Sequence, residues 1–191
     1  MDLIIKKWVK TIPRKNRIKI NNYNRKDYFK QISNIILDTE ENEKGIKKRN
    51  TLIKFVSIID NNDYNKKTEW IYIFTINDII VKIGGTRTGI KGRVSSYLCG
   101  HHIEERGKSG DCSKTNGYIY NTFYYYLKKG YKIKMYGYEL PKTEITINIL
   151  DIDINIIAQT YHAYETTFIE DYKNNYGDYP YLNDNCDPNY K

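Results

Sequence analysis

The stretch that decides the fold is EWIYIFTINDIIVKIGG, residues 69–85. Two runs of β-branched and aromatic residues flank Asn77-Asp78, a pair typical of tight turns, and together they predict a β-hairpin. A three-residue loop would place Tyr72 directly opposite Lys82, with Cβ atoms roughly 5 Å apart. A two-residue loop would pair Tyr72 with Ile83 and leave Lys82 diagonal to it. We predict the first register, which sets an ammonium group beside the Tyr72 phenol.

Hydrophobic periodicity predicts the elements around this hairpin. Helices are expected over residues 28–37, 90–98, 119–127 and 157–172, and strands over residues 131–140 and 144–154. Residues 51–59 fit either a helix or a strand, the glycine pair at 84–85 indicates a turn, and residues 101–116 indicate a long loop. The pattern predicts a mixed α+β fold.

Composition favours a polyanionic partner. The 191 residues carry a formal net charge of +8 and include 20 tyrosines, and aromatic side chains among Lys and Arg suit nucleic-acid binding. A basic surface kept for solubility explains the charge equally well. No stretch approaches the roughly 20 apolar residues of a membrane span, so a soluble cytoplasmic protein is expected. Three cysteines indicate reduced thiols rather than a disulfide framework.

The order and spacing of several residues resemble the GIY-YIG nuclease superfamily over residues 69–183. The matching positions are Tyr72 after Trp70-Ile71, Lys82 before Ile83-Gly84, Arg93, Tyr97, Glu165 and Asn183. Trp70 stands where the family's first glycine usually stands, and Lys82 replaces the second tyrosine, as in some small type II restriction endonucleases of the superfamily. The resemblance implies a small central antiparallel β-sheet flanked by helices, in a GIY-YIG-like nuclease domain over residues 69–191. Residues 1–68 lie outside it and are expected to form a basic N-terminal extension. The resemblance also implies sequence-specific hydrolysis of double-stranded DNA.

The chemistry of these residue types suits phosphodiester hydrolysis. Glu165 is the candidate ligand of a single Mg²⁺, which keeps most of its waters and takes further ligands from phosphate; Mn²⁺ is expected to substitute. Tyr72 serves as a general base only if its pKa, normally about 10, is lowered, and a neighbouring Lys82 would lower it. Arg93 offers a planar fork of donors to phosphate, with Tyr97 on the same helix face. Taken singly, each is explained as a strand aromatic or a surface charge, so the case rests on their joint spacing.

Further residues are candidates for supporting roles. His162 and Asn183 are candidates for phosphate contact or for orienting the site. The candidate DNA contacts are Arg87, His101, His102, Arg106, Lys108 and Lys114. Zinc binding by Cys99, His101, His102 and Cys112 is a further hypothesis, although their spacing fits no standard zinc motif.

Three functions remain open at this point. A type II restriction endonuclease would act as a homodimer on a palindromic site and would need a cognate DNA methyltransferase to protect the host. A homing or mobile-element endonuclease usually carries a separate DNA-binding domain. A catalytically decayed DNA-binding module is the third hypothesis, motivated by Lys82 in place of tyrosine.

Overall fold

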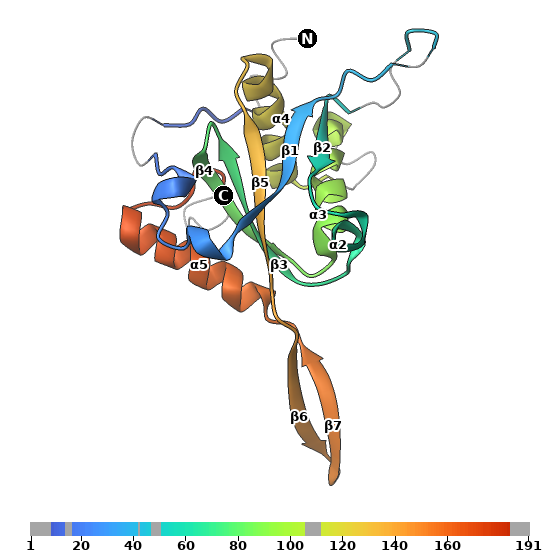
Figure 1. The fold of residues 1–191 in the computed structure, drawn as a ribbon, viewed down its shortest axis with the longest axis vertical. Coiled ribbons are helices and arrows are strands. Elements are labelled where there is room, and N and C mark those ends of the chain that lie inside the picture. The colour runs from blue at the N-terminus through green and yellow to red at the C-terminus, as the bar shows by residue number, and fades with distance from the viewer. Residues whose placement is uncertain (1–8, 14–16, 42, 47–50, 106–111, 184–191) are drawn as a thin grey trace.

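A five-stranded antiparallel sheet forms the centre of the molecule (Figure 1). The computed structural model describes residues 9–13, 17–41, 43–46, 51–105 and 112–183. The strand order is β2-β1-β5-β3-β4, with β1 at Lys30–Leu37, β2 at Ile53–Ser57, β3 at Trp70–Ile76, β4 at Ile79–Thr86 and β5 at Ile133–Glu139. Helices cover both faces, which confirms the predicted mixed α+β class.

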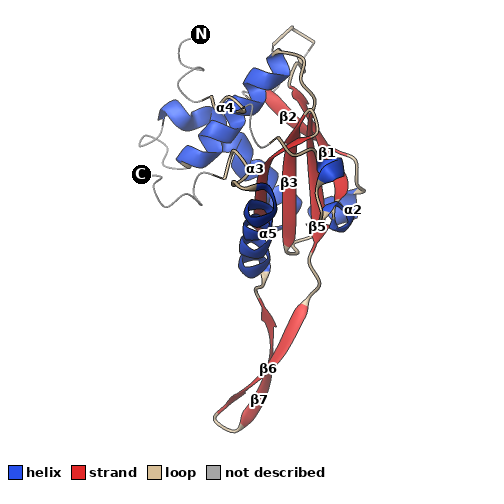
Figure 2. Ribbon diagram, turned by 90° about the vertical axis from the view of Figure 1, so that its left-hand side faces the viewer, coloured by secondary structure: helices blue, strands red, loops and turns tan. Residues whose placement is uncertain are grey.

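Alternation along β3 divides the core into two layers. Tyr72 and Phe74 pack on the face covered by α3 (Gly89–Leu98) and α4 (Lys114–Lys128). Ile71 and Ile73 point to the opposite face, where they meet α5 (Tyr161–Tyr176). Every residue of β3 is buried because helices cover both sides of this central strand (Figure 2). The shorter elements are α2 at Asn61–Asn65 and the 3₁₀ turns η1 at Ile20–Asn22, η2 at Lys26–Tyr28 and η3 at Cys99–Glu105.

The β3–β4 hairpin is confirmed, but its predicted register is wrong. The turn consists of Asn77 and Asp78 alone, with φ values of 47° and 65°, the backbone that fits the twist of a two-residue hairpin. A bulge then leaves Val81 outside the pairing, so Lys82 pairs with Phe74 and Tyr72 pairs with Gly84. Lys82 therefore shares a sheet face with Tyr72 but lies two pairs further along, not directly opposite.

Several element predictions also need correction. Residues 30–37 form strand β1 rather than a helix, and a register shift between Gln31 and Ser33 disturbs the alternation that would have revealed it. Residues 143–158 form two strands, β6 (Thr143–Ile149) and β7 (Ile152–Ala158), where one strand was predicted. Helix α5 begins at Tyr161, since Ile157 belongs to β7. The glycine pair predicted as a turn lies inside β4.

The predicted extension, residues 1–68, supplies two strands of the central sheet. β1 pairs with both β2 and β5, so the sheet continues across the expected boundary at residue 68. DNA contact by this region stays a prediction. No helix among the described residues is long and apolar enough to cross a membrane.

Segments from both ends of the chain line the outer edge of β4. Ile20 N donates to Asp78 O at 2.8 Å, and Ile80 N donates to Ile18 O at 2.8 Å. Further along the same edge, Leu182 N donates to Val81 O at 2.7 Å. The Asn183 side chain then pairs with the backbone of Ile83 through both its Oδ1 (2.9 Å) and its Nδ2 (2.7 Å).

Candidate active site

Tyr72, Arg93 and Tyr97 form a hydrogen-bonded trio between β3 and α3. Arg93 and Tyr97 are four residues apart on α3 and project from one face of it, toward the β3 face that carries Tyr72. Arg93 Nε donates to Tyr72 Oη at 2.7 Å, and Arg93 Nη2 donates to Tyr97 Oη at 3.0 Å. The two phenol oxygens lie 2.7 Å apart. The guanidinium also stacks over the Tyr97 ring, with Cζ 4.4 Å from the ring centroid.

Arg93 keeps N–H groups that the trio does not use. Its Nε and Nη2 each donate one hydrogen bond within the trio, to Tyr72 Oη and Tyr97 Oη. The other guanidinium hydrogens take no part in these bonds, and Arg93 is only partly buried, whereas Tyr72 and Tyr97 are enclosed. These N–H groups can bind an anionic oxygen.

The environment of Tyr72 opposes its predicted role as a general base. Burial raises the pKa of Tyr72 well above its ordinary value, and the neighbouring Tyr97 raises it further, while Arg93 lowers it only in part. Burial lowers the pKa of Arg93, but the two phenols more than offset this and leave it above its ordinary value. The direction of the Tyr72 pKa shift is opposite to the one expected from a neighbouring Lys82.

Two consecutive glycines leave space for the trio and for Glu165 at the same end of β4. A Cβ at Gly84 would lie 2.5 Å from Cζ of Tyr72, so only glycine leaves room for this ring. A Cβ at Gly85, on the opposite face, would lie 3.0 Å from Glu165 Oε2 and 2.9 Å from Tyr161 Cδ2. The Glu165 carboxylate is close enough to raise the pKa of Tyr72. Sequence reasoning missed both glycines, although glycine inside a strand pattern marks a close approach.

A metal at Glu165 would rest on one protein carboxylate. Among the described residues, no three or more His, Cys, Asp or Glu side chains gather in a way that would hold a metal ion. A single carboxylate fits Mg²⁺, which retains waters and accepts phosphate oxygens as ligands. The glycine at 85 keeps space beside Oε2 that a side chain would fill. The donor set is therefore compatible with one hard divalent cation.

Lys82 is buried on the Tyr72 face, and its ammonium reaches the C-terminal segment. Its Nζ lies 3.5 Å from Leu182 O. The groups that shift the pKa of Tyr72 most are its own burial, Tyr97, Arg93 and Glu165. The structure therefore points to a contact that fastens residues 182–183 against β4.

Lys82→Met is expected to leave the pH dependence of activity unchanged. Methionine keeps most of the apolar contact and removes the ammonium, so stability should fall by only about 1 kcal/mol. The measurement is the cleavage rate between pH 6 and 10, together with thermal unfolding. If the rising limb of the pH–rate profile moves to higher pH in this variant, then Lys82 does lower the pKa of Tyr72.

The residues predicted to support the site lie in different parts of the structure. Asn183 is buried and its amide pairs with the Ile83 backbone, so it holds the chain end to β4. His162 is exposed on α5, with Nε2 2.6 Å from Tyr161 Oη. His101 and His102 stack with ring centroids 3.5 Å apart, and His101 Nδ1 lies 2.7 Å from Leu98 O.

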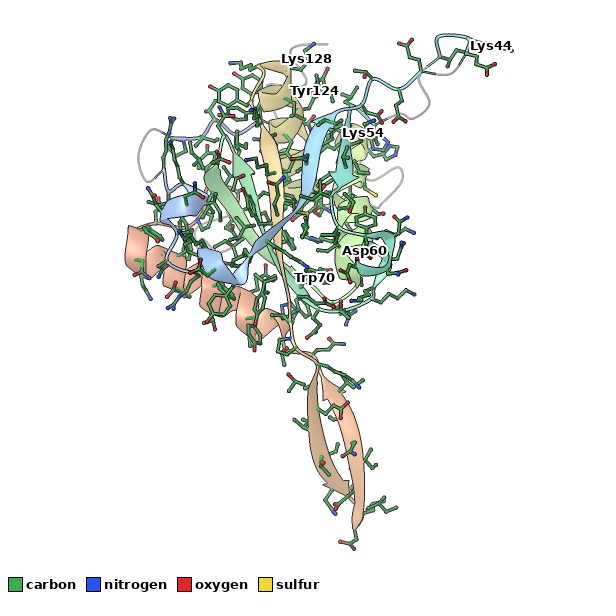
Figure 3. All side chains as sticks on the ribbon, viewed as in Figure 1. Lys44, Lys54, Asp60, Trp70, Tyr124 and Lys128 are labelled. Carbon is green, nitrogen blue, oxygen red and sulfur yellow. The ribbon has the colours of Figure 1, made fainter. Side chains whose placement is uncertain are left out.

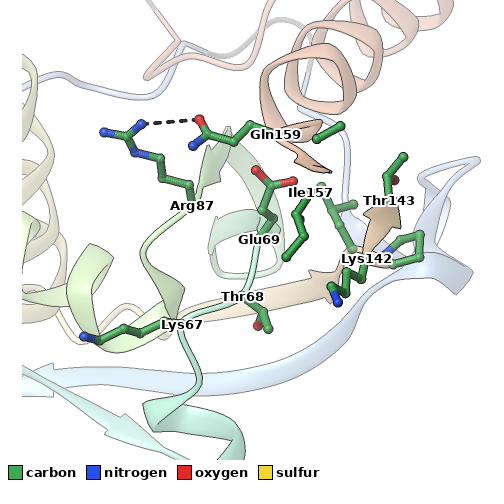
Figure 4. Close-up of a pocket in the computed structure, with 11 residues that line it drawn as sticks. Lys67, Thr68, Glu69, Arg87, Lys142, Thr143, Ile157 and Gln159 are labelled. Atoms are coloured by element: carbon green, nitrogen blue, oxygen red, sulfur yellow. Dashed lines mark hydrogen bonds between the residues drawn. The ribbon is translucent and has the colours of Figure 1, made fainter. Parts of the chain in front are cut away.

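The remaining candidate DNA contacts lie on the surface or outside the described residues. Lys114 is the exposed first residue of α4. Arg106 and Lys108 lie outside the described residues. Arg87 is exposed and donates to Gln159 Oε1 at 3.3 Å. Both Arg87 and Gln159 line a cavity of about 410 Å³ at the base of the β6–β7 hairpin (Figure 4).

Glu69, in the same cavity, is a positioning residue that the sequence did not reveal. Its Oε2 accepts hydrogen bonds from Thr160 N at 2.9 Å and Thr160 Oγ1 at 3.0 Å, just before α5 begins. A carboxylate at a helix N-terminus satisfies a backbone donor and complements the helix dipole. Glu69 thereby fixes the helix that carries Glu165.

Comparison with known proteins agrees with this architecture. No model of a known protein family matches the chain, and no curated protein does. Among solved structures, the restriction endonuclease HPY188I in complex with product DNA is similar over 90% of this chain and 95% of that one, with 23% identity and a TM-score of 0.52. The similarity to HPY188I shows that the two chains share a fold. A mutant of bacteriophage T4 EndoII is similar over 80% of this chain and 94% of that one, at 20% identity and a TM-score of 0.48.

Proposed function

We propose that this chain is a metal-dependent DNA endonuclease of the GIY-YIG superfamily that hydrolyses phosphodiester bonds in double-stranded DNA. The observation that carries the proposal is the Tyr72–Arg93–Tyr97 trio, set at the strand end where Glu165 meets Gly85. The fold shared with a restriction endonuclease bound to product DNA supports it. The net charge of +8 suits a phosphate backbone.

Arg93 is the centre of the proposed chemistry. Its remaining N–H groups bind the scissile phosphate and stabilise the negative charge that develops there, an effect strengthened by burial. The two phenols hold the guanidinium plane in place. With its raised pKa and its enclosed phenol, Tyr72 holds Arg93 in place rather than taking up a proton.

Glu165 is the proposed ligand of the divalent cation, Mg²⁺ with Mn²⁺ as a substitute. When bound, such an ion stabilises the leaving oxygen of a phosphodiester. A cation bound at Glu165 would also neutralise its carboxylate, which is one of the negative charges that raise the pKa of Tyr72.

We further propose that the enzyme is a type II restriction endonuclease, acting in the cytoplasm at a specific sequence. Such an enzyme requires a cognate methyltransferase, because unmodified host DNA would otherwise be cut. Cutting both strands of a palindromic site calls for two active sites related by two-fold symmetry.

Metal removal tests the proposal directly. The full-length protein is incubated with plasmid DNA in Mg²⁺, in Mn²⁺ and in EDTA, and the ends of the products are sequenced. We expect discrete fragments with either metal and loss of cleavage in EDTA, restored by excess Mg²⁺. Cleavage that persists in EDTA would contradict the metal requirement. DNA binding without cleavage in either metal would favour the decayed binding module.

A further inference from the structure

The cavity of about 410 Å³ at the base of the β6–β7 hairpin lies where the hairpin leaves the body near Trp70 (Figures 3 and 4). We call it the hairpin-base cavity. Its lining comes from residues 67–69 before β3, from Arg87 after β4, and from residues 140–143 and 157–159 at the two ends of the hairpin. A cavity of this size suits a small ligand or one unit of a larger one.

Part of this lining is apolar. Leu140 is buried, and Ile157 and Ala158 extend the apolar surface along the last residues of β7. Ala158 pairs with Thr143, so the two share a face, and both line the cavity. The small alanine side chain leaves space there that a larger one would fill. An apolar surface of this kind can receive the face of a nucleobase.

Positive side chains stand beside the apolar part of the cavity. Arg87 and Lys142 are exposed, and Figure 4 shows them on opposite sides of Ile157. Arg87 uses one of its five donors on Gln159 Oε1, at 3.3 Å, and the others can bind a phosphate. Lys142 pairs with Glu144 in an exposed ion pair, which is weak enough to be exchanged for a phosphate contact.

The charge of the lining favours an anion. Three basic side chains and one acidic side chain contribute to it, so its net charge is positive. The basic ones are Lys67, Arg87 and Lys142, and the acidic one is Glu69. Glu69 is already engaged by Thr160, through both the backbone N–H and the hydroxyl. The cavity therefore combines an apolar surface for a ring with cations for a phosphate.

The hairpin-base cavity adjoins the proposed active site. Arg87 follows Gly85 by two residues, and Gln159 precedes the first residue of α5 by two. Gly85 is the position where a Cβ would meet the Glu165 side chain. A DNA strand with a phosphate held between Arg93 and Glu165 therefore passes close to the cavity.

We propose that the hairpin-base cavity binds one nucleotide, with its base against the apolar lining and its phosphate at Arg87 or Lys142. Gln159 accepts from Arg87 through Oε1, which leaves its Nε2 to donate to a carbonyl of the base. A base stacked in a duplex cannot enter a cavity, so a nucleotide of the cut strand would have to be turned out of the helix. A free mononucleotide has the same chemistry. The strand as the source rests on the proposed function, whereas nucleotide binding does not.

Photo-crosslinking of the full-length protein tests the strand as the source. Mixed-sequence duplex DNA containing 4-thiothymidine is bound in Ca²⁺ and irradiated, and the crosslinked peptides are mapped by mass spectrometry. We expect crosslinks in residues 140–143 or 157–159. In Ala158→Trp the indole fills the cavity, so these crosslinks should fall roughly 10-fold or more. Thr146→Trp adds the same side chain at a hairpin position outside the lining and should crosslink as wild type does.

Calorimetry with the four deoxynucleoside 5′-monophosphates tests the free nucleotide. We expect at least one to bind, and Arg87→Gln to weaken its binding roughly 10-fold because a charged hydrogen bond to the phosphate is lost. Lys91→Gln is the matched control. It removes the same charge from an exposed side chain of α3 that donates to Asn65 Oδ1, outside the cavity, and should bind as wild type does.

Each result decides the proposal. Crosslinks in the cavity that Ala158→Trp removes support it with the strand as the source, and monophosphate binding that depends on Arg87 without such crosslinks supports it with a free nucleotide. Absence of both signals overturns it, and so do signals that neither Ala158→Trp nor Arg87→Gln changes. Neither measurement requires cleavage. A protein that binds a nucleotide here but does not cut contradicts the proposed nuclease alone, and one that cuts without filling the cavity contradicts this inference alone.

Discussion

Glu165→Gln is expected to reduce DNA cleavage by roughly 1,000-fold or more while DNA binding is retained. Glutamine keeps the size of the side chain beside Gly85 but removes the charge that would bind a divalent cation. The loss should appear in kcat rather than in DNA affinity, because Arg93 and the basic surface still bind phosphate. Single-turnover cleavage and a binding assay in Ca²⁺ separate these two quantities.

Glu170 provides the matched control on the same helix. Its Oε1 accepts a hydrogen bond from Tyr179 Oη at 2.8 Å, a bond that the glutamine amide oxygen can still accept. Glu170→Gln should therefore cut at close to the wild-type rate. Normal cleavage by Glu165→Gln, or equal losses in the two variants, would remove Glu165 from the metal site.

Gly84→Ala is expected to lose at least about 100-fold in activity and about 1–3 kcal/mol in stability. The new Cβ would stand 2.5 Å from Cζ of Tyr72, and the buried ring has no open space into which it can retreat. The ring must move, which breaks the hydrogen bonds of Tyr72 Oη to Arg93 and Tyr97. Loss of these bonds leaves the guanidinium plane unsupported.

A double-mutant cycle with Tyr72→Leu isolates this contact. Leucine ends short of the phenol position, so Gly84→Ala should cost much less stability in the Tyr72→Leu background than in wild type. Urea unfolding of the four proteins gives the coupling energy. Equal costs in the two backgrounds would mean that the alanine acts on the strand backbone and not on the Tyr72 ring.

The sequence predicted those features that local periodicity controls. Helices α3, α4 and α5 and the β3–β4 hairpin follow from spacing alone, and so does the shared face of Arg93 and Tyr97. The turn has two residues rather than three, which alone would pair Tyr72 with Ile83. The bulge at Val81, which is not visible in such a pattern, then shifts the partner to Gly84. The β6–β7 turn was missed because Leu150-Asp151 adopts positive φ without glycine or asparagine.

The chemistry of Tyr72 shows a second limit. The sign of its pKa shift depends on the balance between burial, which raises the pKa, and a neighbouring positive charge, which lowers it. A sequence indicates the charge more readily than the burial. Lys82 suggested a lowered pKa, yet complete enclosure of the phenol by β4 and α3 raises it. Glu69 was missed for a related reason, since its contact with Thr160 spans 91 positions of the chain.

The lining of β4 by residues 18–20 and 182–183 also protects the protein from misassembly. β4 is an edge strand, and an edge with unpaired backbone groups is a template for strands of other molecules. Contacts from both chain ends occupy that edge, ending at the Asn183 amide, which mimics one residue of a sixth strand. Shortening the chain to end before Leu182 would uncover part of the edge and invite aggregation.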